Sequence, residues 1–139
     1  MKTVSHGVTA IVGPSGSGKS TLAKLMAGFW EPSSGTLLFG GQDIKKIPIT
    51  QLMGHISYVA QDNFLFNKSI KENIRMGRPD ASDEEVYLAA KAANCHDFIM
   101  KLEKGYETMA GDAGGKLSGG ERQRITIARA MLKKADVVI

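Results

Sequence analysis

The sequence predicts an α/β fold, with a parallel sheet core and a mainly helical subdomain, on three observations. An apolar run at residues 8–12 leads through a glycine-rich loop into a helical pattern at 19–27. A second apolar run at 55–60 has the composition of a strand that is buried on both faces. Between 62 and 116 the apolar spacing becomes that of short helices. Buried strands that alternate with helices are typical of α/β domains.

The first part of the chain is expected to form a strand, a loop, a helix and a hairpin. The continuous apolar run at 8–12 suits a buried parallel strand. In 19–27 the apolar residues lie three or four positions apart, and Gly28 is placed to end the helix in the left-handed conformation. The segment 36–39 predicts a strand that turns at the glycine pair 40–41.

The middle of the chain is expected to continue with a strand and short helices. The strand at 55–60 places Gln61 at its carboxyl end, and a helix is expected at 69–76. Ser82 and Glu85 have the spacing of a capping box, which predicts the start of another helix. The apolar face of that helix is expected to contain Val86, Ala89, Ala90 and Ala93.

The last part of the chain predicts a second capped helix and a final strand. Ser118 and Glu121 form the capping box, and the helix is expected to run to about Lys134. Its buried face is expected to contain Ile125, Ala128 and Leu132. An apolar strand follows at 136–139. Within 1–139 we therefore expect a core formed by 1–61 and 117–139, and a helical subdomain formed by 62–116.

Length, composition and charge limit the classes of protein that fit. The 139 residues suit one domain, and 42% hydrophobic with 23% charged residues is typical of a globular protein. No run approaches the roughly 18 apolar residues of a membrane span, the N-terminus lacks the apolar region of a secretory signal, and one cysteine forms no internal disulfide. The net charge of +4 is spread along the chain, so no nucleic-acid partner is expected.

The glycine-rich loop after the first predicted strand matches G-x-x-x-x-G-K-[ST], the Walker A pattern. Glycines let backbone N–H groups turn toward phosphate oxygens, and the following helix adds the partial positive charge of its N-terminus. Lys19 is expected to reach the β and γ phosphates, and the Ser20 hydroxyl to ligate Mg²⁺. The candidate phosphate-binding residues are Gly13, Pro14, Ser15, Gly16, Ser17, Gly18, Lys19, Ser20 and Thr21. The pattern predicts a P-loop NTPase core, which kinases, GTPases, helicases and transporters share.

A second glycine motif opens the last predicted helix. Ser118 is a good cap, and the two glycines after it leave free N–H groups at a helix N-terminus, where an anion binds well. An ordinary capped helix explains Ser118 and Glu121 but not two glycines, which are unfavourable in a first turn. Ser118, Gly119, Gly120 and Glu121 are therefore candidates for a second anion site.

Together, the two motifs resemble those of ABC transporter ATP-binding domains, whose LSGGQ signature has glutamine where this chain has Glu121. The resemblance continues through the segments 58–66 and 69–74 and points to the exporter type of that family. It implies a RecA-like P-loop NTPase fold, incomplete at both ends. It also implies catalytic roles for Lys19 and Gln61, and Mg²⁺ ligation by Ser20 and Gln61.

The resemblance also implies partners and a location. In that family two ATP-binding domains pair head to tail, so Ser118 and Gly120 of one chain would face the γ phosphate held by Lys19 of the other. ATP binding and hydrolysis would then move attached membrane helices and couple to export, at the cytoplasmic face of the membrane. The segment 111–114 stands where the family contacts its membrane-spanning domain, with Asp112 in place of the usual glutamate.

Several residues of the family's catalytic site are not found in these 139 residues. The Walker B aspartate, the catalytic glutamate and the switch histidine would follow the strand at 136–139, and the aromatic residue that stacks on adenine would precede the chain. His6, His55 and His96 do not match the switch histidine. We therefore expect the isolated chain to hydrolyse ATP negligibly, and to be marginally stable or to self-associate through unpaired sheet edges.

Two other functions remain open from the sequence. The chain could act without hydrolysis, as a nucleotide-binding or interaction module that pairs with a complete subunit. DNA-maintenance ATPases of the wider ABC class share both glycine motifs. The exporter-like residues from 61 to 108 and the lack of a coiled-coil insertion argue against that class, and salt-sensitive DNA binding would favour it.

Overall fold

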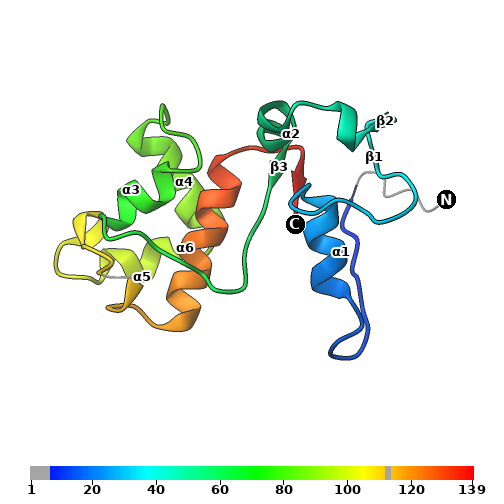
Figure 1. Ribbon diagram of the computed structural model, residues 1–139. Helices are drawn as coiled ribbons and strands as arrows, with labels where there is room; N and C mark the ends of the chain where they lie inside the picture. The colour runs from blue at the N-terminus through cyan, green and yellow to red at the C-terminus, as the bar shows by residue number, and fades with distance from the viewer. Residues whose placement is uncertain (1–6, 112–113) are drawn as a thin grey trace. The chain divides into compact units, whose positions relative to one another are not determined.

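The computed structural model describes residues 7–111 and 114–139, and the chain packs into two compact units that meet in sequence between Leu52 and Met53 (Figure 1). The helix α2 (Ile49–His55) contains this boundary. The expected partition into a core (1–61 and 117–139) and a helical subdomain (62–116) is a different division, and it stays a prediction.

The first unit contains the predicted helix. The helix α1 spans Lys19–Met26, and Gly28 follows with a φ of 74°, in the left-handed conformation that the sequence predicts for its end. Its apolar stripe is only partly covered, because no residue within α1 is buried and only Ala27, directly after it, is fully inaccessible. The Nζ of Lys24 lies 4.7 Å from the ring centroid of Trp30, in a cation–π contact.

A tight hairpin follows in the same unit and confirms the predicted turn. The strand β1 (Leu38–Phe39) pairs antiparallel with β2 (Gln42–Asp43). Gly40 and Gly41 have φ values of 57° and 83°, and two positive values at the centre of a two-residue loop are typical of a type I′ turn. A 3₁₀ turn (Ile44–Lys46) then begins, with the Asp43 side chain accepting from the backbone N–H of Lys45.

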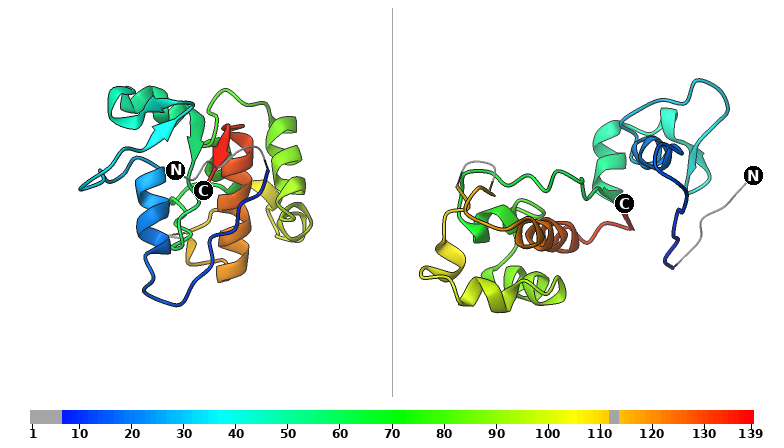
Figure 2. Two further views of the ribbon diagram at one scale, coloured as in Figure 1. Left: turned by 90° about the vertical axis from the view of Figure 1, so that its right-hand side faces the viewer. Right: turned by 90° about the horizontal axis from the view of Figure 1, so that it is seen from below.

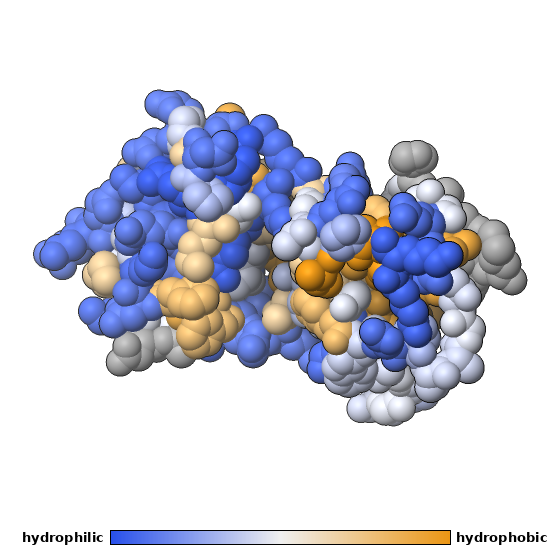
Figure 3. Space-filling view, turned by 45° about the horizontal axis from the view of Figure 1, so that its top comes forward, coloured by the Kyte–Doolittle hydropathy of each residue, from blue (hydrophilic) through white to orange (hydrophobic). Residues whose placement is uncertain are grey.

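The predicted strand at 8–12 is wrong in this structure. These residues pair with no strand among the described residues, and Val8 and Val12 are 102% and 88% exposed. Apolar character favours a parallel strand only where neighbouring strands pair with both of its edges. None of the strands among the described residues pairs with 8–12. This unit therefore carries considerable apolar surface, which is orange in Figure 3.

The second unit begins with a parallel strand pair that joins distant parts of the chain. The strand β3 (Ile56–Ser57) pairs with β4 (Val137–Val138), with Ile56 opposite Val137. The pairing continues past the strands, because the Val59 N–H donates to the Ile139 carbonyl at 2.7 Å. The predicted strands at 55–60 and 136–139 are therefore confirmed as a parallel pair, although each is shorter than expected.

Helices form the rest of the second unit and enclose its core. They are α3 (Ile70–Arg75), α4 (Asp83–Ala92), α5 (His96–Met100), a 3₁₀ turn (Gly105–Glu107) and α6 (Gly119–Leu132). Both α3 and α4 pack against α6, as Figures 1 and 2 show. The core residues include Ile70, Ile74, Val86, Ala89, Ala90, Ile99, Ile125, Ala128 and Leu132. The expected apolar faces of α4 and α6 are therefore the buried ones.

Among residues 7–111 and 114–139, no helix is both long enough and apolar enough to span a bilayer.

Candidate functional site

The loop before α1 is built around the side chain of Lys19. Its Nζ donates to the carbonyl oxygens of Gly13, at 2.9 Å, and Pro14, at 2.7 Å, and lies 3.4 Å from Ser17 Oγ. The ammonium group is therefore held by the loop itself, while residues 13–18 around it are exposed to solvent. An exposed loop that surrounds a fixed ammonium group suits a strongly anionic ligand.

Steric constraints explain why glycine occupies two positions of this loop, 13 and 18. A Cβ at Gly13 would lie 2.7 Å from Ser17 Oγ, so a side chain there would displace Ser17. Gly18 is the N-cap of α1 with a φ of 85°, a conformation that other residues rarely adopt. No side chain caps this end of α1, so its first N–H groups point toward the loop without a side-chain acceptor.

Gln61 lies in a turn after β3, in the second unit. Gln61 is exposed, and its backbone carbonyl oxygen accepts a hydrogen bond from Asn63 Nδ2 at 3.1 Å. The strand ends at Ser57, so Gln61 lies four residues beyond it rather than directly at its carboxyl end. Asn63 has a φ of 48°, in the left-handed region, and this reverses the chain beside α6.

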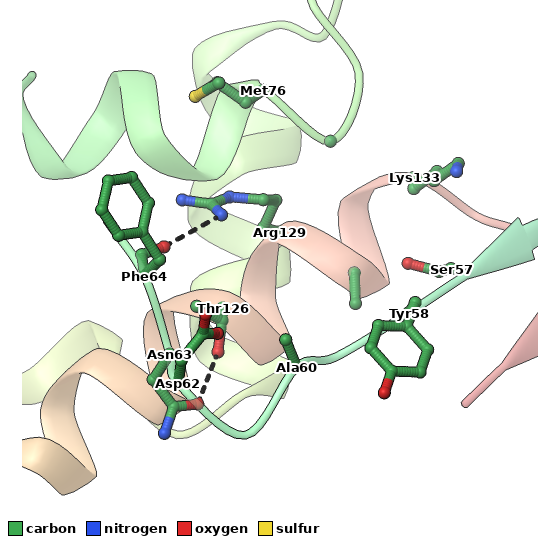
Figure 4. A pocket seen from close by; sticks show the side chains of 12 residues that line it. Ser57, Tyr58, Ala60, Asp62, Asn63, Phe64, Met76, Thr126, Arg129 and Lys133 are labelled. Carbon is green, nitrogen blue, oxygen red and sulfur yellow. Dashed lines mark hydrogen bonds between the residues drawn. The ribbon is translucent and has the colours of Figure 1, made fainter. Parts of the chain in front are cut away.

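A cavity of about 320 Å³ lies between the Gln61 turn and α6, and Figure 4 shows its lining. Ala60 and Asp62 line it on either side of Gln61, and two cationic side chains of α6 and its end, Arg129 and Lys133, line it from the other side. Lys133 Nζ donates to the carbonyl oxygens of Met53 and Ile56, each at 2.6 Å. Its charge is thereby turned toward the end of α2.

The segment at the start of α6 is a complete capping box, as the sequence predicts. The Ser118 N–H donates to Glu121 Oε2 at 2.8 Å, and the Glu121 N–H donates to Ser118 Oγ at 3.3 Å. Ser118, Gly119 and Gly120 are all exposed. The hydrogen bonds from Ser118 and the nearby charge of Arg124 lower the pKa of Glu121, so its carboxylate stays ionised well below neutral pH.

Two arginines beside the glycine pair were given no role from the sequence. A Cβ on Gly119 would lie 3.9 Å from a guanidinium nitrogen of Arg122, and one on Gly120 would lie 4.0 Å from a guanidinium nitrogen of Arg124. Residues three or four positions apart share a helix face. Arginines three and four positions after the two glycines were therefore the sequence signal that could have identified them. The cationic groups offset the Glu121 carboxylate and make this helix end suitable for an anion.

The segment 111–114 is described only at its ends, because Asp112 and Ala113 lie outside the described residues, as does His6. Gly114 is buried with a φ of 77°, and a Cβ there would lie 2.6 Å from Arg122 Cδ. Arg122 also donates from Nη1 to the Leu117 carbonyl at 2.7 Å. The arginine stem therefore lies directly on Gly114, which links this segment to the first turns of α6.

The predicted site residues fall into two groups. The loop 13–21 lies in the first unit, whereas Gln61 and the Ser118 segment both lie in the second.

The two histidines among the described residues each have a polar partner. His96 Nδ1 lies 2.8 Å from the Tyr106 hydroxyl, and His55 Nδ1 lies 2.5 Å from Asp136 Oδ2. No group of three or more histidine, cysteine, aspartate or glutamate side chains among the described residues could hold a metal ion.

A family model described as "ABC transporter" matches residues 2–139. The chain is 50% identical over 137 residues to a putative multidrug export ATP-binding/permease protein of Bacillus subtilis, covering 98% of this chain and 24% of that protein. It is 53% identical over 130 residues to the ATP-dependent lipid A-core flippase of Chromobacterium violaceum, covering 94% of this chain and 22% of the flippase.

A solved structure has the same fold. The structure of a bacterial Atm1-family ABC exporter with ATP bound matches 90% of this chain with a TM-score of 0.87 and 47% identity, and the match covers 22% of the exporter chain. The present chain thus spans less than a quarter of the length of each of these proteins.

Proposed function

Since this chain belongs to the ABC transporter family, we propose that it binds ATP with Mg²⁺ and that the loop 13–21 holds the phosphates. The observation that carries the proposal is the placement of Lys19, whose ammonium group is fixed at the Gly13 and Pro14 carbonyls beside the uncapped start of α1. An ammonium group and free helix N–H groups in one exposed loop are the chemistry that binds a polyphosphate.

Two residues are proposed as ligands of the metal, Ser20 of the first unit and Gln61 of the second. Ser20 follows Lys19 in the first turn of α1 and is exposed, so its hydroxyl is accessible to a cation on the β and γ phosphates. Gln61 supplies an exposed amide oxygen, a suitable ligand for Mg²⁺ or for a water bound to it. Both roles follow the family resemblance.

The Ser118 segment would bind the γ phosphate held by a second ATP-binding domain. Its exposed glycine pair, the guanidinium groups of Arg122 and Arg124 beside that pair and the start of α6 support an anion at this end of the helix. Because the segment and the loop 13–21 would serve different nucleotides, this proposal requires a head-to-tail pair of domains.

At the level of the whole protein, we propose a transporter that couples ATP binding and hydrolysis to export. Its ATP-binding domain would lie at the cytoplasmic face and would contact a membrane-spanning domain. The support comes from the relatives, which include a multidrug export protein, a lipid A-core flippase and an Atm1-family exporter.

The proposal is tested by nucleotide binding to the chain carrying Lys19→Ala. Loss of one charge-assisted contact to phosphate is expected to weaken Mg²⁺·ATP binding by about 10- to 100-fold, measured with radiolabelled ATP. Lys46→Ala is the matched control, because Lys46 is an exposed lysine of the same unit and lies outside the loop. Equal affinities for the wild type and Lys19→Ala would overturn the proposed phosphate site.

A further inference from the structure

The turn that carries Gln61 is attached to α6 through one side chain. Asn63 donates from Nδ2 to the backbone carbonyl oxygen of Gln61 at 3.1 Å. Its Oδ1 accepts a hydrogen bond from Thr126 Oγ1 at 3.3 Å, which Figure 4 shows as a dashed line. One asparagine therefore holds the Gln61 backbone on one side and the middle of α6 on the other. Its backbone is left-handed, with a φ of 48°.

The Thr126 end of this connection has two alternatives. The hydroxyl has a single hydrogen, and besides Asn63 Oδ1 it reaches the carbonyl oxygen of Gln123, 2.8 Å away in the preceding turn of α6. Thr126 is only 8% exposed, so a hydroxyl left without an acceptor would be costly. Because the Gln123 carbonyl lies within hydrogen-bond distance, the hydroxyl keeps an acceptor even without Asn63.

The chain beyond Asn63 is fixed more firmly to the same helix. Arg129 donates from Nη1 to the Phe64 carbonyl at 3.3 Å, and from Nε and Nη2 to the carbonyl and side-chain oxygens of Asn73, at 2.8 and 3.0 Å. Asn73 is fully buried and in turn donates to the Phe66 carbonyl at 3.0 Å. The contacts of Arg129 therefore fix the chain to α6 from Phe64 onward, whereas the Gln61 turn is attached to α6 through Asn63.

The helix that bears Thr126 also bears Ser118 at its start. The helix α6 is continuous over Gly119–Leu132, and Thr126 lies eight residues after Ser118, about two turns along the axis. A contact between the Gln61 turn and α6 thus links the position of Gln61 to the helix that begins at the second candidate anion site.

We propose that Asn63 and Thr126 form a releasable latch that positions Gln61 against α6. The latch rests on the proposed function, in which Gln61 contacts Mg²⁺ or its water. When it is closed, Thr126 donates to Asn63 and the turn is held for metal binding. When it is open, Thr126 donates to Gln123 and Gln61 moves independently of α6. Asn63 and Thr126 are positioning residues, because neither touches nucleotide or metal.

The first test measures the latch itself by amide hydrogen exchange of the wild-type chain and its variants. Thr126→Val keeps the shape of the side chain and removes the hydroxyl, and Asn63→Gly keeps the left-handed backbone and removes both amide contacts. Each is expected to raise the exchange rate in 61–64 about threefold, the loss expected from one neutral hydrogen bond. Thr126→Ser, which keeps the hydroxyl, is expected to exchange like the wild type.

The second test measures the Mg²⁺ concentration that half-saturates ATP binding to the same variants. Thr126→Val and Asn63→Gly are expected to raise it about threefold, with ATP binding in EDTA unchanged and with Thr126→Ser restoring the wild-type value. Circular dichroism melting of each variant verifies that it is folded. A merely structural role for the pair would lower the melting temperature and leave this Mg²⁺ requirement unchanged.

The outcomes separate the latch from the function on which it depends. If ATP binding requires Lys19 but neither variant changes exchange or the Mg²⁺ requirement, the latch is refuted and the nucleotide site stands. If exchange in 61–64 rises while the Mg²⁺ requirement stays the same, the contact exists but does not position Gln61, and the proposal also fails. If ATP binding does not require Lys19, the proposed function itself is overturned.

Discussion

Gly77 shows how closely single atoms determine the packing of the second unit. It follows α3, and a Cβ at this position would lie 2.1 Å from the carbonyl oxygen of Arg129, in the backbone of α6. The obstacle is a helix backbone rather than a flexible side chain, so it cannot turn aside. The close approach of α3 to α6 therefore depends on the absence of a side chain at Gly77.

Gly77→Ala is expected to lower the free energy of unfolding by about 1–3 kcal/mol, because α3 must shift away from α6. Gly54→Ala is the matched control: Gly54 lies within α2, and a Cβ there would meet nothing within 4 Å. That substitution is expected to stabilise by about 0.5–1 kcal/mol, since alanine favours a helix over glycine. Urea denaturation of both variants measures the difference. A Gly77→Ala chain as stable as Gly54→Ala would contradict the packing argument.

Among single residues, the sequence predicted those whose role is local. Gly28, Ser82 and Ser118 act on neighbours within four positions, so the pattern around each was sufficient. Asn63 and Arg129 act on residues that lie more than 50 positions away in the sequence, Thr126 and Asn73. No pattern in a single sequence predicts contacts between residues so far apart. These contacts determine the surroundings of Gln61, which the sequence therefore did not predict.

At the scale of elements, three helices in the described part of the chain begin with a complete capping box. Two of them, at Ser82 and Ser118, were predicted from the sequence. The third, Ser69 with Glu72, has the same S-x-x-E spacing and opens α3. Helix starts were thus predictable, whereas the strand at 8–12 was not, because a parallel strand forms only against strands that are themselves present.

Glu85 makes stability depend on pH through the start of α4. Hydrogen bonding from Arg78, followed by the Ser82 backbone N–H, lowers the pKa of Glu85 from 4.5 to about 2. Since the folded-state pKa lies below the unfolded value, the stabilisation is complete above about pH 5 and is lost as the pH falls toward 2. The same carboxylate reaches Lys134 at 3.4 Å, just after α6.

Glu85→Gln is expected to lower stability at pH 7 and to flatten the decline in stability between about pH 5 and 2. Urea denaturation at pH 7, 5 and 3 measures both effects. Glu84→Gln is the control, because Glu84 is an exposed neighbour on α4 that makes no ion pair among the described residues. If Glu85→Gln and Glu84→Gln lose stability in parallel as the pH falls, the role assigned to Arg78 is wrong.

At the scale of the molecule, the two units differ in how much apolar surface they bury. In the first unit the buried apolar side chains are those of Ala27 and Leu52, among the described residues. The second unit contains the contiguous core around α6. The sequence led us to expect marginal stability for the whole chain. We now predict that the first unit is the less stable of the two.

Amides of 7–52 are expected to exchange at least about tenfold faster than those of α3, α4 and α6, because few buried contacts oppose local opening. Hydrogen exchange with mass spectrometry measures both regions in one sample. Mg²⁺·ATP is expected to slow exchange in 13–26, since ligand binding stabilises the form that binds. Equal protection of the two units without nucleotide would contradict this prediction.

The contact between Lys24 and Trp30 has a spectroscopic consequence. Trp30 is the only tryptophan of the chain, it is half exposed, and it stacks against a lysine of the helix that begins at Lys19. Its indole fluorescence therefore originates entirely within the first unit, and the emission maximum reports the solvent around α1. Excitation of the unlabelled protein near the red edge of its absorption therefore yields fluorescence from Trp30 alone. Changes in this fluorescence report structural changes in 7–52, and the second unit contributes no tryptophan emission.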